Sequence, residues 1–249
     1  MLPKKFQFRF GEYFERSGEK VKLKRTLSIE GHAHTDFTDG RSSAEDCAAR
    51  AVEAGLETLV FAEHIHRGAP WFEPYAAEIE RLKALHKGKL KIVCGIEARI
   101  IDAGGELDAD EEMLERAEVV VGSVHALPPA GKSPVDLLYI RSRREKLDCE
   151  LELLEAIAKN PAVDVVGHPF GSYFEPHGPP PEDYMFKVLD FAAAPGKAVE
   201  INAAHADVGW FLNCAMKYGK DFLFWPASDA HYARDVGRIC GELNKELKD

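Results

Sequence analysis

The stretch Gly31–Gly40 has the sequence GHAHTDFTDG and follows an alternating apolar run over residues 26–30 that predicts a strand. Side chains of a strand point alternately to its two faces, so His32 and His34 point the same way and both imidazoles can reach one metal ion. Asp39 follows on a turn that ends in glycine and can fold back as a further oxygen ligand. A single His-x-His pair is a weak signal, and its weight depends on whether the rest of the chain repeats the arrangement.

Apolar runs alternate with amphipathic segments along the whole chain after this stretch. The runs predict strands at residues 26–30, 57–62, 90–96, 118–122, 163–167, 198–202 and 221–227. The segments between them predict helices at about 44–55, 73–86, 110–117, 141–159, 182–193, 207–218 and 233–247. Near-continuous apolar strands are typical of parallel strands buried on both faces. The alternation therefore predicts about seven β–α units, a parallel sheet with helices outside it.

The length of 249 residues suits one large domain, and no stretch after residue 25 is rich enough in Pro, Gly and Ser to separate a second one. We expect residues 1–25 to form a lead-in arm or hairpin, and residues 26–249 to form the domain. Two Pro- and Gly-rich stretches, 127–134 and 170–181, predict long loops.

The net charge of −10 provides no basic excess to neutralise phosphates, which argues against nucleic acid as a partner. A small anionic substrate remains compatible, because metal ions can supply local positive charge. The five cysteines are scattered without metal-ligand spacing, which argues against a disulfide framework. No secretory signal and no apolar run of about 20 residues is present, so we expect a cytoplasmic protein without a membrane segment.

Metal-ligand side chains recur at the end of almost every predicted strand. Parallel strands of a closed barrel end on one face, where active sites are built, so these residues should converge. Six histidines and three carboxylates exceed what one four- to six-coordinate ion needs, and they suit two or three ions with a bridging carboxylate. Mixed imidazole and carboxylate ligands favour Zn, Mn or Fe over Mg or Ca. The residues are His32, His34, Asp39, His64, Glu97, His125, His168, Asp229 and His231.

Three arginines follow predicted strands closely and are candidates for binding a substrate anion, since guanidinium suits phosphate. They are Arg67, Arg99 and Arg234. Of the remaining histidines, we expect His66 to be exposed. His177 and His205 could reach the site from its rim, but we favour a position on the surface for both.

The ordered motifs of the chain resemble those of the PHP superfamily of metal-dependent phosphoesterases, most closely its histidinol-phosphate phosphatase branch. The resemblance covers about residues 28–237 and implies a distorted (β/α)7 TIM-like barrel with a trinuclear metal site. It rests on His-Ala-His-Thr with Thr-Asp-Gly, then Ala-Glu-His, Gly-Ile-Glu, Gly-Ser-Val-His, Gly-His-Pro, Glu-Ile-Asn and Ser-Asp-Ala-His.

Carried over residue by residue, the resemblance implies three ion sites that share one carboxylate. The first ion would be held by His32, His34, Glu97 and Asp229. Glu97 would bridge to a second ion, also held by His125 and His168, and the third would be held by Asp39, His64 and His231. The chain departs from the usual family pattern at Glu30-Gly31 and at Ala62-Glu63-His64, where an acidic residue before the first histidine and Thr-Asp-His are commoner. Neither departure removes a ligand.

The expected reaction is hydrolysis of a small phosphomonoester such as histidinol phosphate by a metal-activated hydroxide. Metal binding can lower the pKa of water from 15.7 to about 7, which makes this nucleophile available near neutral pH. We expect catalytic roles for Glu97, Asp229, His231, Arg99 and Arg234, with Asp229 or His231 passing a proton to the leaving alcohol and the arginines offsetting phosphoryl charge.

Three alternatives stay open. The substrate could be a nucleotide, a sugar phosphate or a phosphodiester. An amidohydrolase-type deaminase or lactonase also uses a barrel with His-x-His after its first strand, but such enzymes commonly place a lysine on strand 4, and residues 119–122 contain none. A PHP-like barrel could also serve as a metal-stabilised module without catalysis, although a complete ligand set argues against that reading.

Overall fold

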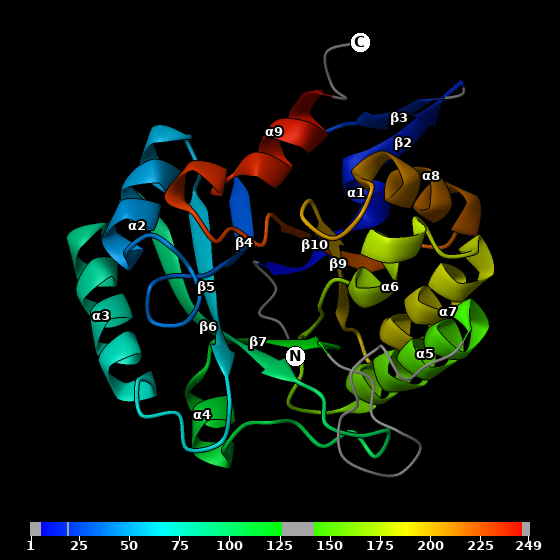
Figure 1. The fold of residues 1–249 in the computed structure, drawn as a ribbon. Coiled ribbons are helices and arrows are strands. Elements are labelled where there is room, and N and C mark those ends of the chain that lie inside the picture. The colour runs from blue at the N-terminus through cyan, green and yellow to red at the C-terminus, as the bar shows by residue number, and fades with distance from the viewer. Residues whose placement is uncertain (1–5, 19, 126–141, 246–249) are drawn as a thin grey trace.

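A curved sheet with helices packed around its outside forms the body of the protein, which was analysed as a computed structural model (Figure 1). The structure describes residues 6–18, 20–125 and 142–245, so the predicted loop at 127–134 lies outside the described residues. The strand order is β1-β10-β9-β8-β7-β6-β5-β4. The seven parallel strands are β4 (Ile29–Ala33), β5 (Thr58–Ile65), β6 (Lys91–Arg99), β7 (Val119–Ser123), β8 (Val165–Val166), β9 (Ala198–Asn202) and β10 (Leu223–Ala227).

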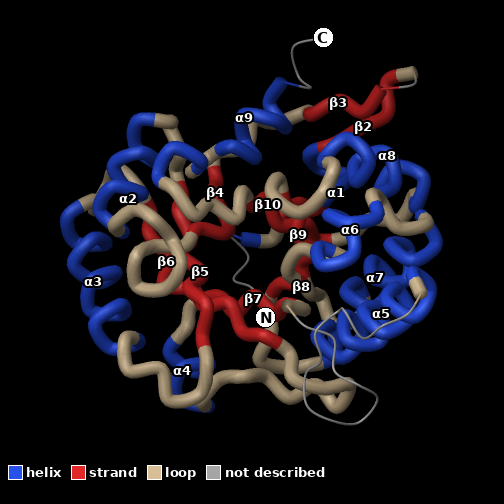
Figure 2. Tube along the Cα trace, in the orientation of Figure 1, coloured by secondary structure: helices blue, strands red, loops and turns tan. Residues whose placement is uncertain are grey.

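The parallel strands follow one another in the sheet in chain order, with helices in between, which confirms the predicted (β/α)7 TIM-like architecture. Figure 2 shows the parallel strands gathered inside a ring of helices. Ser43 and Ser142 begin α2 and α5 as capping boxes, in which each serine exchanges hydrogen bonds with the third residue of its helix. The helices are α2 (Ala44–Glu53), α3 (Phe72–Leu85), α4 (Glu111–Arg116), α5 (Arg143–Lys159), α6 (Gly171–His177), α7 (Glu182–Ala193), α8 (Val208–Tyr218) and α9 (Arg238–Lys245).

Two helices differ clearly from the sequence prediction. The stretch 170–181, expected to be a loop, contains α6, because burial of Phe170 and Tyr173 outweighs the local Gly and Pro content. The last helix, expected from residue 233, begins only at Arg238, after a short 3-10 turn at Ala233–Asp235.

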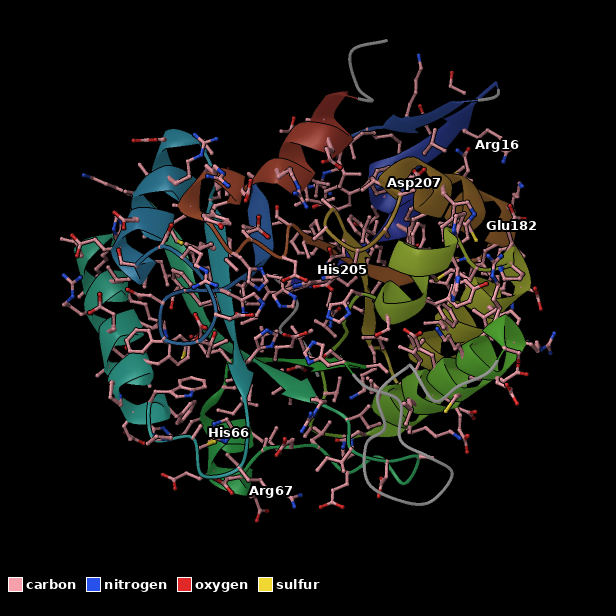
Figure 3. All side chains as sticks on the ribbon, in the orientation of Figure 1. Arg16, His66, Arg67, Glu182, His205 and Asp207 are labelled. Carbon is pink, nitrogen blue, oxygen red and sulfur yellow. The ribbon has the colours of Figure 1, made fainter. Side chains whose placement is uncertain are left out.

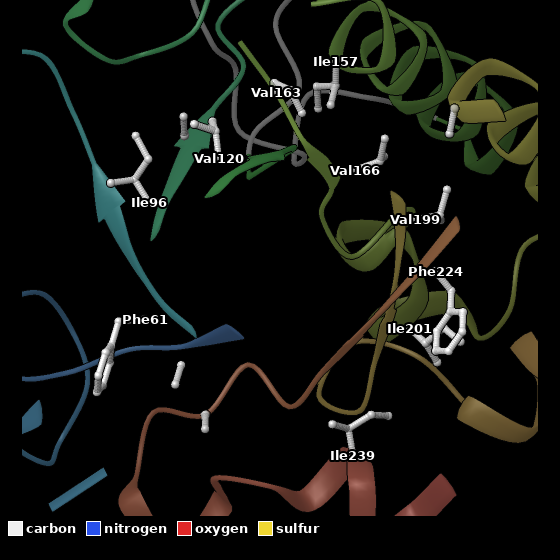
Figure 4. Packing of buried hydrophobic residues seen from close by; sticks show 14 of the residues in the cluster. Phe61, Ile96, Val120, Ile157, Val163, Val166, Val199, Ile201, Phe224 and Ile239 are labelled. Atoms are coloured by element: carbon white, nitrogen blue, oxygen red, sulfur yellow. The ribbon is translucent and has the colours of Figure 1, made fainter. Parts of the chain in front are cut away.

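Alternate residues of the strands supply two separate cores. On β5, Leu59 and Phe61 pack into the large cluster between sheet and helices, part of which is shown in Figure 4. Their neighbours Val60 and Ala62 point the other way and join a smaller cluster inside the barrel, which Trp225 also fills. The continuous apolar runs of the sequence thus reflect strands that are buried on both faces.

The seam between β10 and β4 is closed by the segments that carry the first and last predicted ligands. The backbone N–H of His34 donates to Ala230 O at 2.9 Å, and the backbone N–H of Ala230 donates to His32 O at 3.1 Å. A Cβ on Gly31 would lie 2.4 Å from Pro226 O, so only glycine allows this approach. Strand β4 therefore extends past the predicted end at residue 30, and His32 lies within it.

The N-terminal residues contribute to the same body. Strand β1 (Phe8–Arg9) pairs antiparallel with β10, and α1 (Phe10–Tyr13) leads to a hairpin of β2 (Phe14–Ser17) and β3 (Lys20–Leu23). The division of the chain into a lead-in arm or hairpin at 1–25 and one domain at 26–249 stays a prediction. Among the described residues, no helix combines the length and the apolar character needed to cross a membrane.

Candidate metal centre

Side chains from the carboxyl ends of the parallel strands meet at one end of the barrel. His32 lies on β4, His64 on β5 and Glu97 on β6, and the others follow the strands in short loops. Imidazole and carboxylate atoms within 4 Å of each other connect all nine predicted side chains into one cluster. The convergence expected from a parallel barrel is therefore what the structure shows, while the roles of the residues as ligands stay proposals.

Glu97 is at the centre of this cluster and is almost completely buried, with 1% of its surface exposed. Its Oε1 lies 2.9 Å from His125 Nε2 and 2.8 Å from His168 Nε2, and its Oε2 lies 2.7 Å from His64 Nδ1. Burial alone would raise the pKa of this carboxyl, but His125 and the other surrounding imidazoles hold the pKa well below its usual range. Both oxygens are thus shared between different histidines, which is the geometry of a bridging carboxylate.

Asp229 is the second buried carboxylate, and it faces two groups of side chains. Its Oδ1 lies 3.1 Å from His34 Nε2, and its Oδ2 lies 3.0 Å from His205 Nε2. The φ angle of Asp229 is 51°, a left-handed conformation that costs energy for any residue other than glycine. Such conformations cluster at functional sites, where the surrounding structure holds them in place.

A more open group of four side chains extends the cluster outwards. Asp39 Oδ2 lies 3.4 Å from His64 Nε2 and 3.2 Å from His231 Nε2, and the His34 ring packs against both imidazoles. A Cβ on Gly40 would lie 2.6 Å from the backbone nitrogen of Thr35, so the turn that presents Asp39 requires glycine.

The donor atoms of the cluster fit divalent transition-metal ions. The Nε2 atoms of His32 and His34 face each other at 3.0 Å. Glu97 Oε2 and Asp229 Oδ1 are buried close to imidazole nitrogens, without a well-directed hydrogen bond among the described residues. Imidazole nitrogens and carboxylate oxygens of this kind are ligands for Zn, Mn and Fe. Three sets bring their donor atoms within 4.8 Å of one another: His34, Asp39, His64 and His231; His32, His34 and Glu97; and His64, Glu97 and His125.

Glu200 contacts His32 and His168 on the side away from the other ligands, and it is not among the site residues predicted from the sequence. Its Oε1 lies 2.8 Å from His32 Nδ1, and its Oε2 accepts from the backbone N–H of His168 at 2.6 Å and from Asn202 Nδ2 at 3.1 Å. A carboxylate behind a metal-binding histidine fixes the tautomer and direction of the ring. The signal in the sequence was an acidic side chain within the apolar run 198–202.

His205 does not lie where the sequence predicted it, whereas His66 does. His205, expected on the surface, lies against Asp229, and its ring packs 5.1 Å from that of His168 (Figure 3). This contact depends on the loop that follows β9, where Asn202 Oδ1 accepts from the backbone N–H of His205, and spacing alone does not reveal it. His66 is exposed, as expected.

A cavity of about 390 Å³ adjoins the cluster at the carboxyl ends of β5 and β6. His64, Glu97 and His125 line its inner part, and Arg99 lies on its outer wall, where it donates to Asp108 Oδ2 at 2.7 Å. Arg67 lies outside this lining and pairs with Glu106. The exposed Arg234 has its guanidinium carbon 4.1 Å from the ring centroid of Tyr232, and its role in catalysis stays a prediction.

Comparison with known proteins adds family evidence to this geometry. The PHP domain model matches residues 30–204. A probable phosphatase of Photobacterium profundum is 30% identical over 223 residues, 85% of this chain and 81% of that protein. A probable phosphatase of Caldanaerobacter subterraneus is 28% identical over 231 residues, 88% of this chain and 82% of that protein.

Among solved structures, the histidinol phosphate phosphatase of Lactococcus lactis has a similar fold. It superimposes with a TM-score of 0.65 at 22% identity, over 89% of this chain and 92% of that chain, and it was solved with zinc, L-histidinol and phosphate. The predicted resemblance is thereby confirmed at the level of fold and family. Since the family model covers most of the strands that build the cluster, this chain belongs to the PHP domain family.

Proposed function

We propose that this protein is a metal-dependent phosphatase that hydrolyses a small-molecule phosphomonoester. The observation that carries the proposal is the cluster of nine imidazole and carboxylate side chains around Glu97, beside a cavity that can admit a small substrate. Relatives that share most of their length with this chain carry the name probable phosphatase, which supports the same reaction.

We propose that the cluster forms a trinuclear site that binds two or three divalent ions of Zn, Mn or Fe. Bound ions would offset charge on the phosphoryl oxygens and lower the pKa of a bound water from 15.7 to about 7. The first ion would be held by His32, His34, Glu97 and Asp229, the second by Glu97, His125 and His168, and the third by Asp39, His64 and His231.

The residues of the chain would orient the substrate and move one proton. Water oxygen forms a bond to phosphorus and gives up one proton to a residue of the chain, the ester P–O bond breaks, and the released alkoxide takes a proton from that residue. Asp229 and His231 are the candidates for donating it, because both lie within the cluster and contact each other: His231 Nδ1 lies 3.7 Å from Asp229 Oδ1. Arg99 would offer guanidinium N–H groups to an anionic part of the substrate.

Elemental analysis paired with a phosphate-release screen tests the proposal. The screen includes p-nitrophenyl phosphate, histidinol phosphate, a nucleotide monophosphate and a sugar phosphate. Two to three transition-metal ions per chain with turnover of a monoester is the expected result. A metal-loaded protein that releases phosphate from none of them would refute the phosphatase and favour an amidohydrolase-type reaction or a non-catalytic module.

A further inference from the structure

The cavity at the candidate metal centre has two chemically different ends. Its inner end consists of the candidate ligands His64, Glu97 and His125. Its outer wall consists of His66, Arg99 and Asp108, with Ile65 between the two ends. A molecule that fills this space of about 390 Å³ contacts both the candidate ligands and the outer wall.

The spacing of the two ends follows from β6. Glu97 and Arg99 are two residues apart on this strand, so their side chains leave the same face. Two residues of a strand span about 6.5 Å. The Arg99 guanidinium is bonded to Asp108 and not to Glu97, so we expect the group that meets the outer wall to belong to the part of the substrate beyond the phosphoryl group.

Arg99 is held at the outer wall by Asp108. Arg99 Nη2 donates to Asp108 Oδ2 at 2.7 Å, and Asp108 Oδ1 accepts from the backbone N–H of Arg67 at 3.2 Å, on the loop after β5. Asp108 thus connects the guanidinium to a second segment of the rim. Arg67 is fixed in turn by Glu106 and by Leu107 O, at 3.1 Å from its Nη2 (Figure 3).

The outer wall presents donors rather than acceptors. Both oxygens of Asp108 accept from N–H groups, and its side chain is only 18% exposed, against 38% for Arg99. A guanidinium has five N–H donors, and the recorded bond to Asp108 uses one of them. A group that completes this wall is therefore an oxyanion rather than an ammonium or imidazolium ion.

We infer that the outer wall binds an oxyanion on the leaving-group half of the substrate, so the preferred substrates are small phosphomonoesters that carry a second carboxylate or phosphate. Arg99 is the specificity-determining residue, and Asp108 is the residue that positions it. The inference rests on the proposed phosphatase reaction and restricts its substrate class.

Matched substrates test this inference on the metal-loaded protein. Glycerol 3-phosphate and 3-phosphoglycerate share a carbon skeleton, but only the second has an anionic leaving group. Glycerol 1,3-bisphosphate shows whether the outer wall prefers a second phosphate to a carboxylate. Histidinol phosphate has a cationic leaving group. A hydrogen bond to a charged partner predicts a kcat/KM about 10-fold or more higher for the two anionic esters than for glycerol 3-phosphate. Equal values, or a preference for histidinol phosphate, would overturn the inference.

Variants show whether Arg99 causes the preference. R99M is expected to reduce the ratio of kcat/KM between 3-phosphoglycerate and glycerol 3-phosphate to about one, and D108N to raise KM for the anionic ester more than it changes kcat. R116M is the matched control, because Arg116 is also paired with a carboxylate, that of Glu73, but lines a different hollow between α3 and α4. Equal losses of R99M on both substrates would place Arg99 at the phosphoryl group and refute the assignment.

The two proposals fail in different ways. A protein that hydrolyses p-nitrophenyl phosphate without distinguishing the matched esters refutes only the anionic leaving group. If the protein hydrolyses no monoester, the proposed phosphatase activity is refuted. The binding affinities of the matched esters, measured by calorimetry, then still test whether the outer wall binds an oxyanion. In that case equal affinity for 3-phosphoglycerate and glycerol 3-phosphate overturns the inference.

Discussion

Replacing Glu200 by alanine removes the carboxylate that lies behind His32 in the metal centre. Glu200 is buried in the middle of β9, with Oε1 2.8 Å from His32 Nδ1 and Oε2 2.6 Å from the backbone nitrogen of His168. The alanine variant leaves both of these donors buried without this acceptor. Because the second nitrogen of His32 faces the cluster, the substitution acts on the proposed metal site without removing a ligand.

The contacts set the size of the expected effect. An unpaired buried donor costs about 1–3 kcal/mol, so loss of both acceptors should lower the free energy of unfolding of the metal-free protein by about 2–6 kcal/mol. Loss of a carboxylate partner behind a ligating histidine weakens metal affinity by about 10- to 100-fold. The E200Q variant keeps one acceptor oxygen for the two donors, and we expect it to show a smaller effect on both quantities.

Metal titration against buffered zinc, followed by elemental analysis, measures the affinity, and urea unfolding of the metal-free protein measures the stability. E155A is the control, because Glu155 is a partly exposed carboxylate on α5 that pairs with Lys159. An E200A protein with the metal affinity and stability of the control would refute the positioning role of Glu200. A variant that loses stability but keeps its metal affinity would show that the carboxylate is purely structural.

Two further substitutions test other parts of the molecule. E97A should lose both bound metal and phosphatase activity, since one carboxylate contacts three histidines; a variant with full metal content and activity would disprove the bridging assignment. Burial raises the pKa of Glu150 from 4.5 to about 8, so the stability that this group contributes is fully present below pH 4.5 and is lost as the pH rises through 8. Urea unfolding of metal-free wild-type and E150Q proteins should therefore show a stability difference that shifts against the wild type by about 1.4 kcal/mol per pH unit across this window, about 5 kcal/mol in all, and parallel pH profiles would contradict it.

Most of the proposed ligands could be predicted from the sequence because their signal is local. A run of apolar residues followed by His, Glu or Asp places a polar side chain at a strand end, and the parallel topology places all strand ends together. His64 and His125 show this best: they lie 33 and 28 residues from Glu97 along the chain and contact it, yet the strand pattern alone locates both.

The partners of these ligands could not be predicted in the same way. His205 meets Asp229 because the loop after β9 folds back through hydrogen bonds to Asn202, and Glu30 accepts from the backbone N–H groups of Ser228 and Gly237, both about 200 residues away. These contacts depend on how the barrel closes. Closure in turn depends on the fit of a glycine against β10, which no period in the sequence encodes.

At the metal centre, buried charged groups lie close together, and Asp229 adopts a left-handed backbone conformation. Burial alone would lower the pKa of His32, but the carboxylates of Glu200, Asp229 and Glu97 raise it well above its usual value, so the metal-free protein keeps a proton there. Metal uptake must displace this proton, because ligating histidines are neutral. An ion that binds only the folded chain adds about 2.7 kcal/mol of stability at 100 times its Kd, which is comparable to the cost of a left-handed residue such as Asp229. Metal loading is therefore expected to stabilise the same barrel seam that positions the ligands, so that folding and the assembly of the active site are coupled through one set of contacts.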